Sequence, residues 1–184
     1  METGGYFIVN GNEKVIRLLI VPKRNHPQAL IRNSFEKRGQ SYTNFGVQIR
    51  CARPDQTTLT NVLHYLDNGN IILRFSWRKA EYLIPVMMIL NALVNTNDKA
   101  IFDGIAAGRG EEAFIAERVE GLLRTYKTYQ LYTQRDTLAY LGEKFRVVFD
   151  EAEDITDEHL GEIFLHRVIL VHLTSNADKF RLLM

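Results

Sequence analysis

The spacing of apolar residues divides the chain into two parts with different periods. Up to about residue 82, apolar and polar residues alternate, as in 47–51 and 71–77, and this period of two is typical of strands that bury one face. Beyond that point the apolar residues recur at helical spacing. The sequence therefore predicts an α+β fold, with a β-hairpin-rich N-terminal half followed by a mainly helical C-terminal half.

Two tight turns are predicted in the first half. Asn10-Gly11 and Asn68-Gly69 each separate two strand-like segments, and Asn-Gly favours the positive φ angles of a hairpin turn. Shorter strands are expected at 18–21, stopped by Pro22, and at 29–31. The strand after the second turn is expected to place Ile71, Leu73, Phe75 and Trp77 on a core face and Ile72, Arg74, Ser76 and Arg78 on the opposite face.

Helices are predicted at 83–94, 98–107 and 111–126, then after the N-cap residues Thr133 and Thr156. Pro85 is expected in the first turn of the first helix, where its missing N–H costs little, and Thr96 or Asn97 is expected to cap the second. Residues 145–149 are predicted to form a final short strand. Residues 179–184 are expected to stop in mid-helix, so the chain is expected to be a piece of a larger protein.

The net charge of +1 results from an uneven distribution. Residues 1–90 carry 12 Lys/Arg against 6 Asp/Glu, whereas residues 91–184 carry 11 against 16. The segment from Lys14 to Arg53 contains nine Lys/Arg and a single acid, Glu36, with aromatic residues interleaved. Such a segment suits non-specific contact with a nucleic-acid backbone, but it also suits a solvated surface or one that neutralises acidic neighbours.

Catalytic and cofactor motifs are missing from the sequence. The single cysteine, Cys51, excludes an internal disulfide and a cysteine-based zinc site, and it is expected to be a core residue. The five histidines have no metal-ligand spacing, and the glycines at 108 and 110 lack the residues of a phosphate-binding loop. No signal peptide or membrane span is recognised. We therefore expect a soluble intracellular protein with no active site, metal or cofactor of its own.

The opening segment carries a specific motif. Residues 4–15, GGYFIVNGNEKV, resemble the signature of second-largest subunits of multisubunit RNA polymerases, and the fit extends over essentially the whole chain. The RNA polymerase I form of that family, in its fungal versions, is the most similar. Its resemblance rests on the segments 24–27, 42–47, 53–57, 61–66, 75–79, 140–147 and 178–180.

The resemblance implies a place within a transcription machine. Residues 1–22 would be the end of a protrusion domain, and residues 23–184 would be a lobe domain truncated within its last helix. The lobe would form a wall of the downstream DNA cleft and would bind a TFIIF-like subunit heterodimer and a zinc-ribbon subunit. The catalytic magnesium ligands would belong to the largest subunit. The location would be the nucleus and nucleolus, where rRNA genes are transcribed.

Six cationic residues are the candidates for a surface that contacts DNA or a protein partner. Two classes of function remain open for the chain. The first class is a non-catalytic lobe that binds DNA weakly and other polymerase subunits through its faces. The second is an autonomous basic nucleic-acid-binding module that carries the same hairpin. The six candidate residues are Lys23, Arg24, Lys37, Arg38, Arg74 and Arg78.

Overall fold

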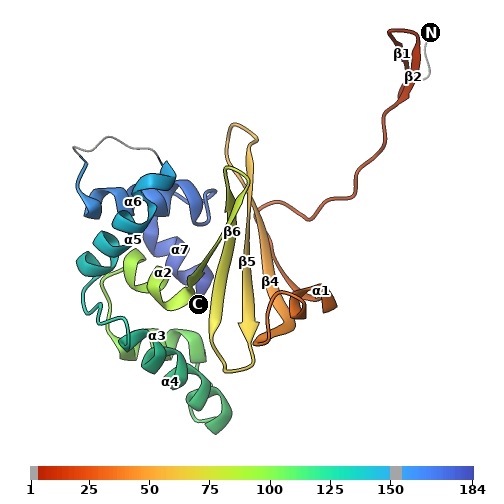
Figure 1. Cartoon of the computed structure of the whole chain (residues 1–184). Coiled ribbons are helices and arrows are strands. Elements are labelled where there is room, and N and C mark those ends of the chain that lie inside the picture. Colours follow the sequence, from red (N-terminus) through yellow and green to blue (C-terminus); the bar gives the residue numbers. More distant parts are fainter. Residues whose placement is uncertain (1–3, 150–154) are drawn as a thin grey trace.

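The computed structural model describes residues 4–149 and 155–184, which form a layered body with an N-terminal arm (Figure 1). A five-stranded antiparallel sheet has helices on both of its faces, most of them on one side. Residues 150–158 are rich in Asp and Glu, and the first five of them lie outside the described residues. The elements are β1 (Tyr6–Val9), β2 (Asn12–Val15), β3 (Pro27–Ile31), α1 (Asn33–Glu36), β4 (Tyr42–Ala52), β5 (Thr58–Leu66), β6 (Ile71–Trp77), β7 (Ala80–Pro85), α2 (Val86–Leu93), α3 (Asp98–Ala106), α4 (Ala113–Lys127), α5 (Gln134–Phe149), α6 (Asp157–Val168) and α7 (Asn176–Leu183).

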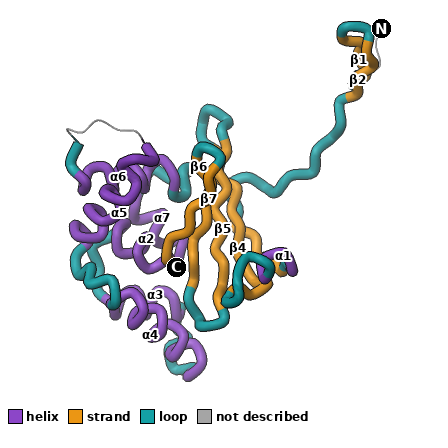
Figure 2. The backbone as a smooth tube through the Cα atoms, in the orientation of Figure 1, coloured by secondary structure: helices purple, strands orange, loops and turns teal. Residues whose placement is uncertain are grey.

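The N-terminal arm is the predicted hairpin followed by an extended linker. β1 and β2 pair antiparallel around Asn10 and Gly11, whose φ angles of 50° and 75° are those that the Asn-Gly turn requires. The strand predicted at 18–21 is wrong, because this segment is extended without a pairing partner and runs from the arm to the sheet (Figure 2). Its apolar side chains are largely exposed, with Leu18 at 93%.

The main sheet has the order β3-β4-β5-β6-β7, so every neighbouring pair is joined by a simple antiparallel connection. β5 and β6 form the second predicted hairpin, with Gly69 at a φ of 84° in its turn. Arg78 is not in the strand as expected. It lies in the β6–β7 turn with Lys79, and both residues have positive φ angles.

The helix predicted from residue 83 begins later, at Val86. Residues 80–85 pair with β6 as strand β7, and Pro85 precedes the helix instead of lying in its first turn. The short strand predicted at 145–149 is also wrong. These residues are the last turn of α5, which buries Phe145 and Phe149 four positions apart on one helix face.

Three helix starts agree with the capping patterns, whereas α4 begins at Ala113, two residues later than predicted, without a side-chain cap. Asn97 accepts a hydrogen bond from the backbone of Ala100, and Thr133 and Asp136 each accept one from the other's backbone N–H, as in a capping box. Thr156 caps α6, which ends at Val168. No helix in the described residues is long and apolar enough to cross a membrane.

The hydrophobic core lies between one face of the sheet and the helical layer. α2 is its centre, since seven of its eight residues are buried. Phe75 of β6 packs against Phe145 of α5 and Phe164 of α6, with ring centroids 6.0 Å and 5.7 Å away, and Phe145 and Phe164 stack 4.5 Å apart. Phe75 is thus buried as predicted, whereas Trp77 is only partly buried against this core. Cys51 is fully buried in it, and burial raises the pKa of its thiol to about 11.

Polar groups tie the helical layer to the sheet at two buried points. The side chain of Asn61 on β5 donates to the carbonyl of Val168 (3.2 Å) and accepts from the backbone N–H of Leu170 (3.1 Å). Lys179 of α7 donates from Nζ to the carbonyl of Leu165 at 2.7 Å, and burial lowers the pKa of its ammonium group to about 8. A buried amide or ammonium group without a hydrogen-bond partner would lower the stability of the fold. The side chains of Asn61 and Lys179 therefore fix the C-terminal end of α6.

Candidate functional site

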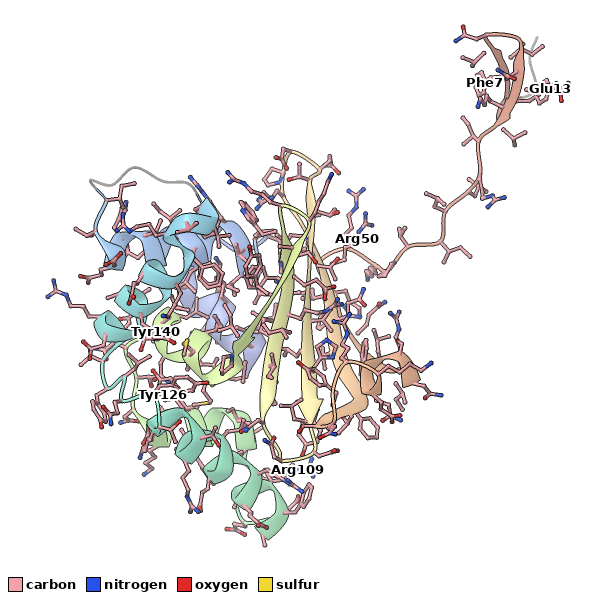
Figure 3. All side chains as sticks on the ribbon, viewed as in Figure 1. Phe7, Glu13, Arg50, Arg109, Tyr126 and Tyr140 are labelled. Atoms are coloured by element: carbon pink, nitrogen blue, oxygen red, sulfur yellow. The ribbon has the colours of Figure 1, made fainter. Side chains whose placement is uncertain are left out.

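The outer face of the sheet, opposite the main helical layer, carries most of the polar chemistry. Strand register places Gln48, Arg50, Thr60, Arg74 and Ser76 on this one face, because they are paired with or offset by two from one another. The short helix α1 covers part of the same face, on the side away from α2–α7 (Figure 1). Figure 3 labels Arg50 on this side of the molecule.

α1 is held to the outer face by a small satellite core. Phe35 is buried and packs edge-on against the ring of His64, 4.6 Å between centroids, and Tyr42 contacts the same ring at 5.6 Å. Gly46 on β4 leaves room for this helix, since a Cβ there would lie 2.9 Å from Phe35. The contact fixes the position of Lys37 and Arg38, which directly follow α1.

Two of the predicted cations meet at one carboxylate. Glu81 on β7 accepts a hydrogen bond from Nη1 of Arg38 at 2.9 Å and from Nη1 of Arg74 at 2.6 Å, one on each carboxylate oxygen. The bond from Arg38 is the largest cause that holds the pKa of Glu81 below its usual value. The structure therefore brings Arg38, which follows α1, to Arg74 of β6 and Glu81 of β7.

A buried histidine is part of the same cluster. His64 is 0% exposed, and neither of its ring nitrogens has a hydrogen-bond partner among the described residues. Burial, reinforced by Arg74 and Arg38, lowers the pKa of His64 to about 4. At neutral pH the ring is thus uncharged, and the two arginines and Glu81 set the charge of the cluster.

The other predicted cations lie in three separate places. Arg24 forms a β-bridge with Arg50, and its guanidinium donates to the side chain of Gln56, so it is anchored at one end of β4. Lys23, Lys37 and Arg78 are exposed, Lys23 in the linker and Arg78 in the turn after β6. The six candidate residues therefore do not form one compact site. Only Arg38 and Arg74 lie together, because both bind Glu81.

Three members of this surface are missing from the sequence-based set. Arg50 is predicted only as part of a strand, and Glu81 and His64 carry no pattern of their own. Glu81 is paired with Ser76 in the β6–β7 hairpin. A correct prediction of this hairpin would have placed Glu81 on the same face as Arg74. Within the described residues, no group of three or more His, Cys, Asp or Glu side chains could hold a metal ion.

An apolar groove lies on the other face of the sheet, beside the helical layer. Its volume is about 470 Å³, and it is formed where β3 and β4 extend beyond the helices. Ile31, Phe45 and Val47 are 70%, 52% and 38% exposed there. β3 is also an edge strand of the sheet, so this corner combines exposed apolar side chains with an unpaired strand edge.

Comparison with known proteins identifies the family. Residues 23–183 match the family model described as RNA polymerase Rpb2, domain 2. The chain belongs to this family. The match to Rpb2 domain 2 confirms the predicted fold class and the resemblance to second-largest polymerase subunits.

Several relatives of this Rpb2 domain 2 chain are subunits of RNA polymerase I. The chain is 60% identical over its full length to the probable DNA-directed RNA polymerase I subunit RPA2 of Schizosaccharomyces pombe. It is 54% identical over its full length to subunit RPA135 of Saccharomyces cerevisiae, and 40% identical over 99% of its length to human RPA2. In each case the chain spans 16% of the relative's length.

Proposed function

We propose that this chain is the lobe of the second-largest subunit of a nuclear DNA-directed RNA polymerase I. In this role it is a non-catalytic part of a nucleotidyltransferase, forms a wall of the downstream DNA cleft and acts in rRNA gene transcription in the nucleolus. The single observation that carries the proposal is that 99–100% of this chain aligns with RNA polymerase I subunits of fungi and mammals. Residues 1–22 are the end of the neighbouring protrusion domain and residues 23–184 are the lobe.

The two faces of the sheet support two separate roles. The outer face carries Arg50, Arg74 and the cations around α1, which suits weak, sequence-independent contact with a phosphate backbone. The apolar groove at β3 suits protein contact, because exposed apolar side chains beside an open strand edge are typical of docking surfaces. We assign the groove to polymerase subunits, with the TFIIF-like heterodimer and the zinc-ribbon subunit as partners.

The exposed arm fits the same assignment. Leu18, Leu19 and Ile20 are 78–104% exposed and pair with no strand of the described residues. A run of bare aliphatic side chains is stable only where other protein covers it. In the proposed assembly, the protrusion domain of the same subunit supplies that cover.

An exchange experiment tests the assignment. The chain would replace the matching segment of the S. pombe subunit, and assembly of RNA polymerase I would be measured by purification and growth. We expect an assembled, active enzyme. A Phe45→Asp/Val47→Asp variant should keep the core enzyme and lose peripheral subunits. The matched control is Val147→Asp, at a residue of α5 that is 89% exposed. An enzyme that fails to assemble with the unaltered chain contradicts the proposal, and equal subunit loss in both variants contradicts the groove assignment.

The second candidate is an autonomous nucleic-acid-binding module, favoured by nine cations and one acid between Lys14 and Arg53. A salt-titrated DNA-binding assay on the isolated chain separates the two functions. A lobe should bind duplex DNA with a Kd of roughly 10⁻⁴–10⁻⁶ M, without sequence preference, and lose it steeply with salt. Tight, sequence-selective binding at physiological salt would support the module and contradict the lobe.

A further inference from the structure

The carboxylate of Glu81 occupies the position that an incoming anion would take at Arg38 and Arg74. Each arginine donates to a different oxygen of the carboxylate, at 2.9 Å and 2.6 Å. Two guanidinium groups that converge on neighbouring oxygens present the geometry that also binds a phosphate group. The pair of arginines would carry two positive charges, of which Glu81 neutralises one.

The layering of the three side chains leaves Glu81 outermost. Its side chain is 49% exposed, against 32% for Arg38 and 19% for Arg74. Glu81 also lies on β7, an edge strand, near the exposed turn at residues 78–79. An anion that approaches from solvent therefore meets the carboxylate first and can replace it while the arginines stay in place.

One buried donor of the cluster lacks a partner. Among the described residues, Nε of Arg74 has no hydrogen-bond partner, although Nη1 of the same guanidinium binds Glu81. A buried donor without a partner is costly, and a bound anion with its ordered water can supply acceptors that a single carboxylate does not. This second observation indicates a site that is incomplete when only Glu81 fills it.

We propose that Arg38 and Arg74 form a phosphate-binding site and that Glu81 is a built-in competitor which holds this site closed. The inference rests on the proposed function, because it assigns a regulated contact to the DNA-facing surface. A nucleic-acid backbone fits better than an isolated acidic side chain, since Arg50, Arg24 and Lys37 add further cations on or near the same face. Nucleic acid, with its row of phosphates, engages all of them at once.

The test compares two variants that remove the same charge. Glu81→Gln removes the competitor, whereas Glu36→Gln removes an exposed acid of α1 that forms no ion pair among the described residues. Binding of the 184-residue chain to a fluorescent duplex of about 20 base pairs would be measured from about 50 to 200 mM salt. We expect Glu81→Gln to raise affinity about 3- to 10-fold at low salt. We also expect the slope of log K against log salt to steepen by about 0.9 for each additional phosphate that the variant binds.

Further variants tie the gain to the arginines. Adding Arg38→Gln to Glu81→Gln should remove most of the gain, and Glu81→Asp, whose shorter side chain reaches one arginine, should give an intermediate gain. Melting temperatures of all variants are measured in parallel to show that they fold. If Glu81→Gln does not fold, the gain in DNA affinity is measured with Glu81→Asp instead. Equal gains in Glu81→Gln and Glu36→Gln overturn the proposal, because total charge then explains both. A gain for an acidic peptide but not for DNA overturns it in favour of a protein partner.

A complete lack of DNA binding by both the unaltered chain and Glu81→Gln also overturns the inference. That result would leave the proposed place in the polymerase standing, because the exchange experiment measures assembly and not DNA binding. The reverse result, failed assembly with a normal gain in Glu81→Gln, contradicts the proposed function and keeps the phosphate site. The two experiments thus fail independently.

Discussion

The two faces of the five-stranded sheet differ in how tightly their side chains are fixed. On the inner face, aromatic rings from β6, α5 and α6 pack together, and the backbones of α5 and α6 come into close contact at Gly142 and Gly161. On the outer face, one short helix covers a satellite core around His64, and charged side chains meet at Glu81. The inner face holds the domain together, and the outer face leaves charged groups able to exchange partners.

The difference teaches where substitutions should affect stability and where they should affect binding. A close-packed interior cannot absorb added or deleted atoms without cost. Half-exposed ion pairs contribute little to stability, so they are free to be replaced by a ligand's charges. Substitutions on the inner face should therefore lower the free energy of unfolding, and substitutions on the outer face should change DNA binding at nearly constant stability.

The largest effect is expected where α5 and α6 touch. A Cβ at Gly161 would lie 2.2 Å from the carbonyl oxygen of Leu138, and one at Gly142 would lie 1.8 Å from that of Asp157. Because backbone atoms cannot move aside as a flexible side chain can, Gly161→Ala should cost about 4 kcal/mol or more of unfolding free energy. Urea unfolding followed by circular dichroism measures this cost.

Gly121 of α4 is the matched control for this substitution. It is a helical glycine with nothing within 4 Å of a built Cβ, so Gly121→Ala should stabilise the chain by about 0.5–1 kcal/mol. A Gly161→Ala variant as stable as the unaltered chain would show that α5 and α6 can move apart at little cost. The inner face would then be no more tightly packed than the outer face.

The next effect compares one apolar residue from each face. Phe75 is 1% exposed in the aromatic cluster, so Phe75→Ala should cost about 3–5 kcal/mol. Trp77 is only partly buried against Phe149, and its replacement by alanine should lie at the lower end of that range. Leu83, 50% exposed on the outer face of β7, is the control, and its replacement should cost less than about 1 kcal/mol. Similar costs at Phe75 and Leu83 would contradict the difference between the faces.

Local pattern is sufficient for the hairpins and caps because the signals there are short-range. Asn10-Gly11, Asn97 and Thr133 determine their turns and helix starts with neighbours three residues away or fewer. The secondary-structure predictions that were wrong lie where tertiary contacts decide between a strand and a helix. Residues 83–85 begin an apolar run that predicts a helix, yet pairing with β6 makes them the end of a strand, and Phe145 and Phe149 complete a helix face rather than a strand.

The candidate site is only partly accessible from the sequence for the same reason. Arg38 and Arg74 are recognisable as cations, but their meeting point depends on how α1 lies on the sheet and on Glu81 from a third element. The unpartnered nitrogens of His64 depend on burial by Phe35 and have no sequence signal. Charge content is a property of a segment, whereas an ion-pair cluster is a property of the fold.

The third effect is a pH dependence from the outer face. The pKa of His64 is lowered from 6.5 to about 4 in the folded chain by burial. Between these values the unfolded chain binds the proton and the folded chain does not, so stability should fall as pH drops from about 6.5 towards 4. Each unit of pKa difference is worth about 1.4 kcal/mol, so the loss is at most about 3.5 kcal/mol.

His64→Phe isolates this contribution, because the ring contact with Phe35 remains and the titration is removed. The difference in unfolding free energy between the unaltered chain and His64→Phe should shift with pH over this window. A His64→Phe variant with the same pH dependence as the unaltered chain would show that the buried ring takes up its proton without penalty.

The smallest effect on stability is expected at the cations that follow α1. Lys37 is exposed and the Arg38 pair with Glu81 is partly exposed, so Lys37→Glu/Arg38→Glu should change the free energy of unfolding by less than about 1 kcal/mol. The same variant should weaken DNA binding and reduce the salt slope by about 0.9 for each phosphate group that the chain no longer binds. Lys99→Glu/Lys144→Glu makes an equal charge change on exposed residues of the helical layer. If both variants weaken binding equally, DNA responds to the total charge of the chain, and the outer face has no special role.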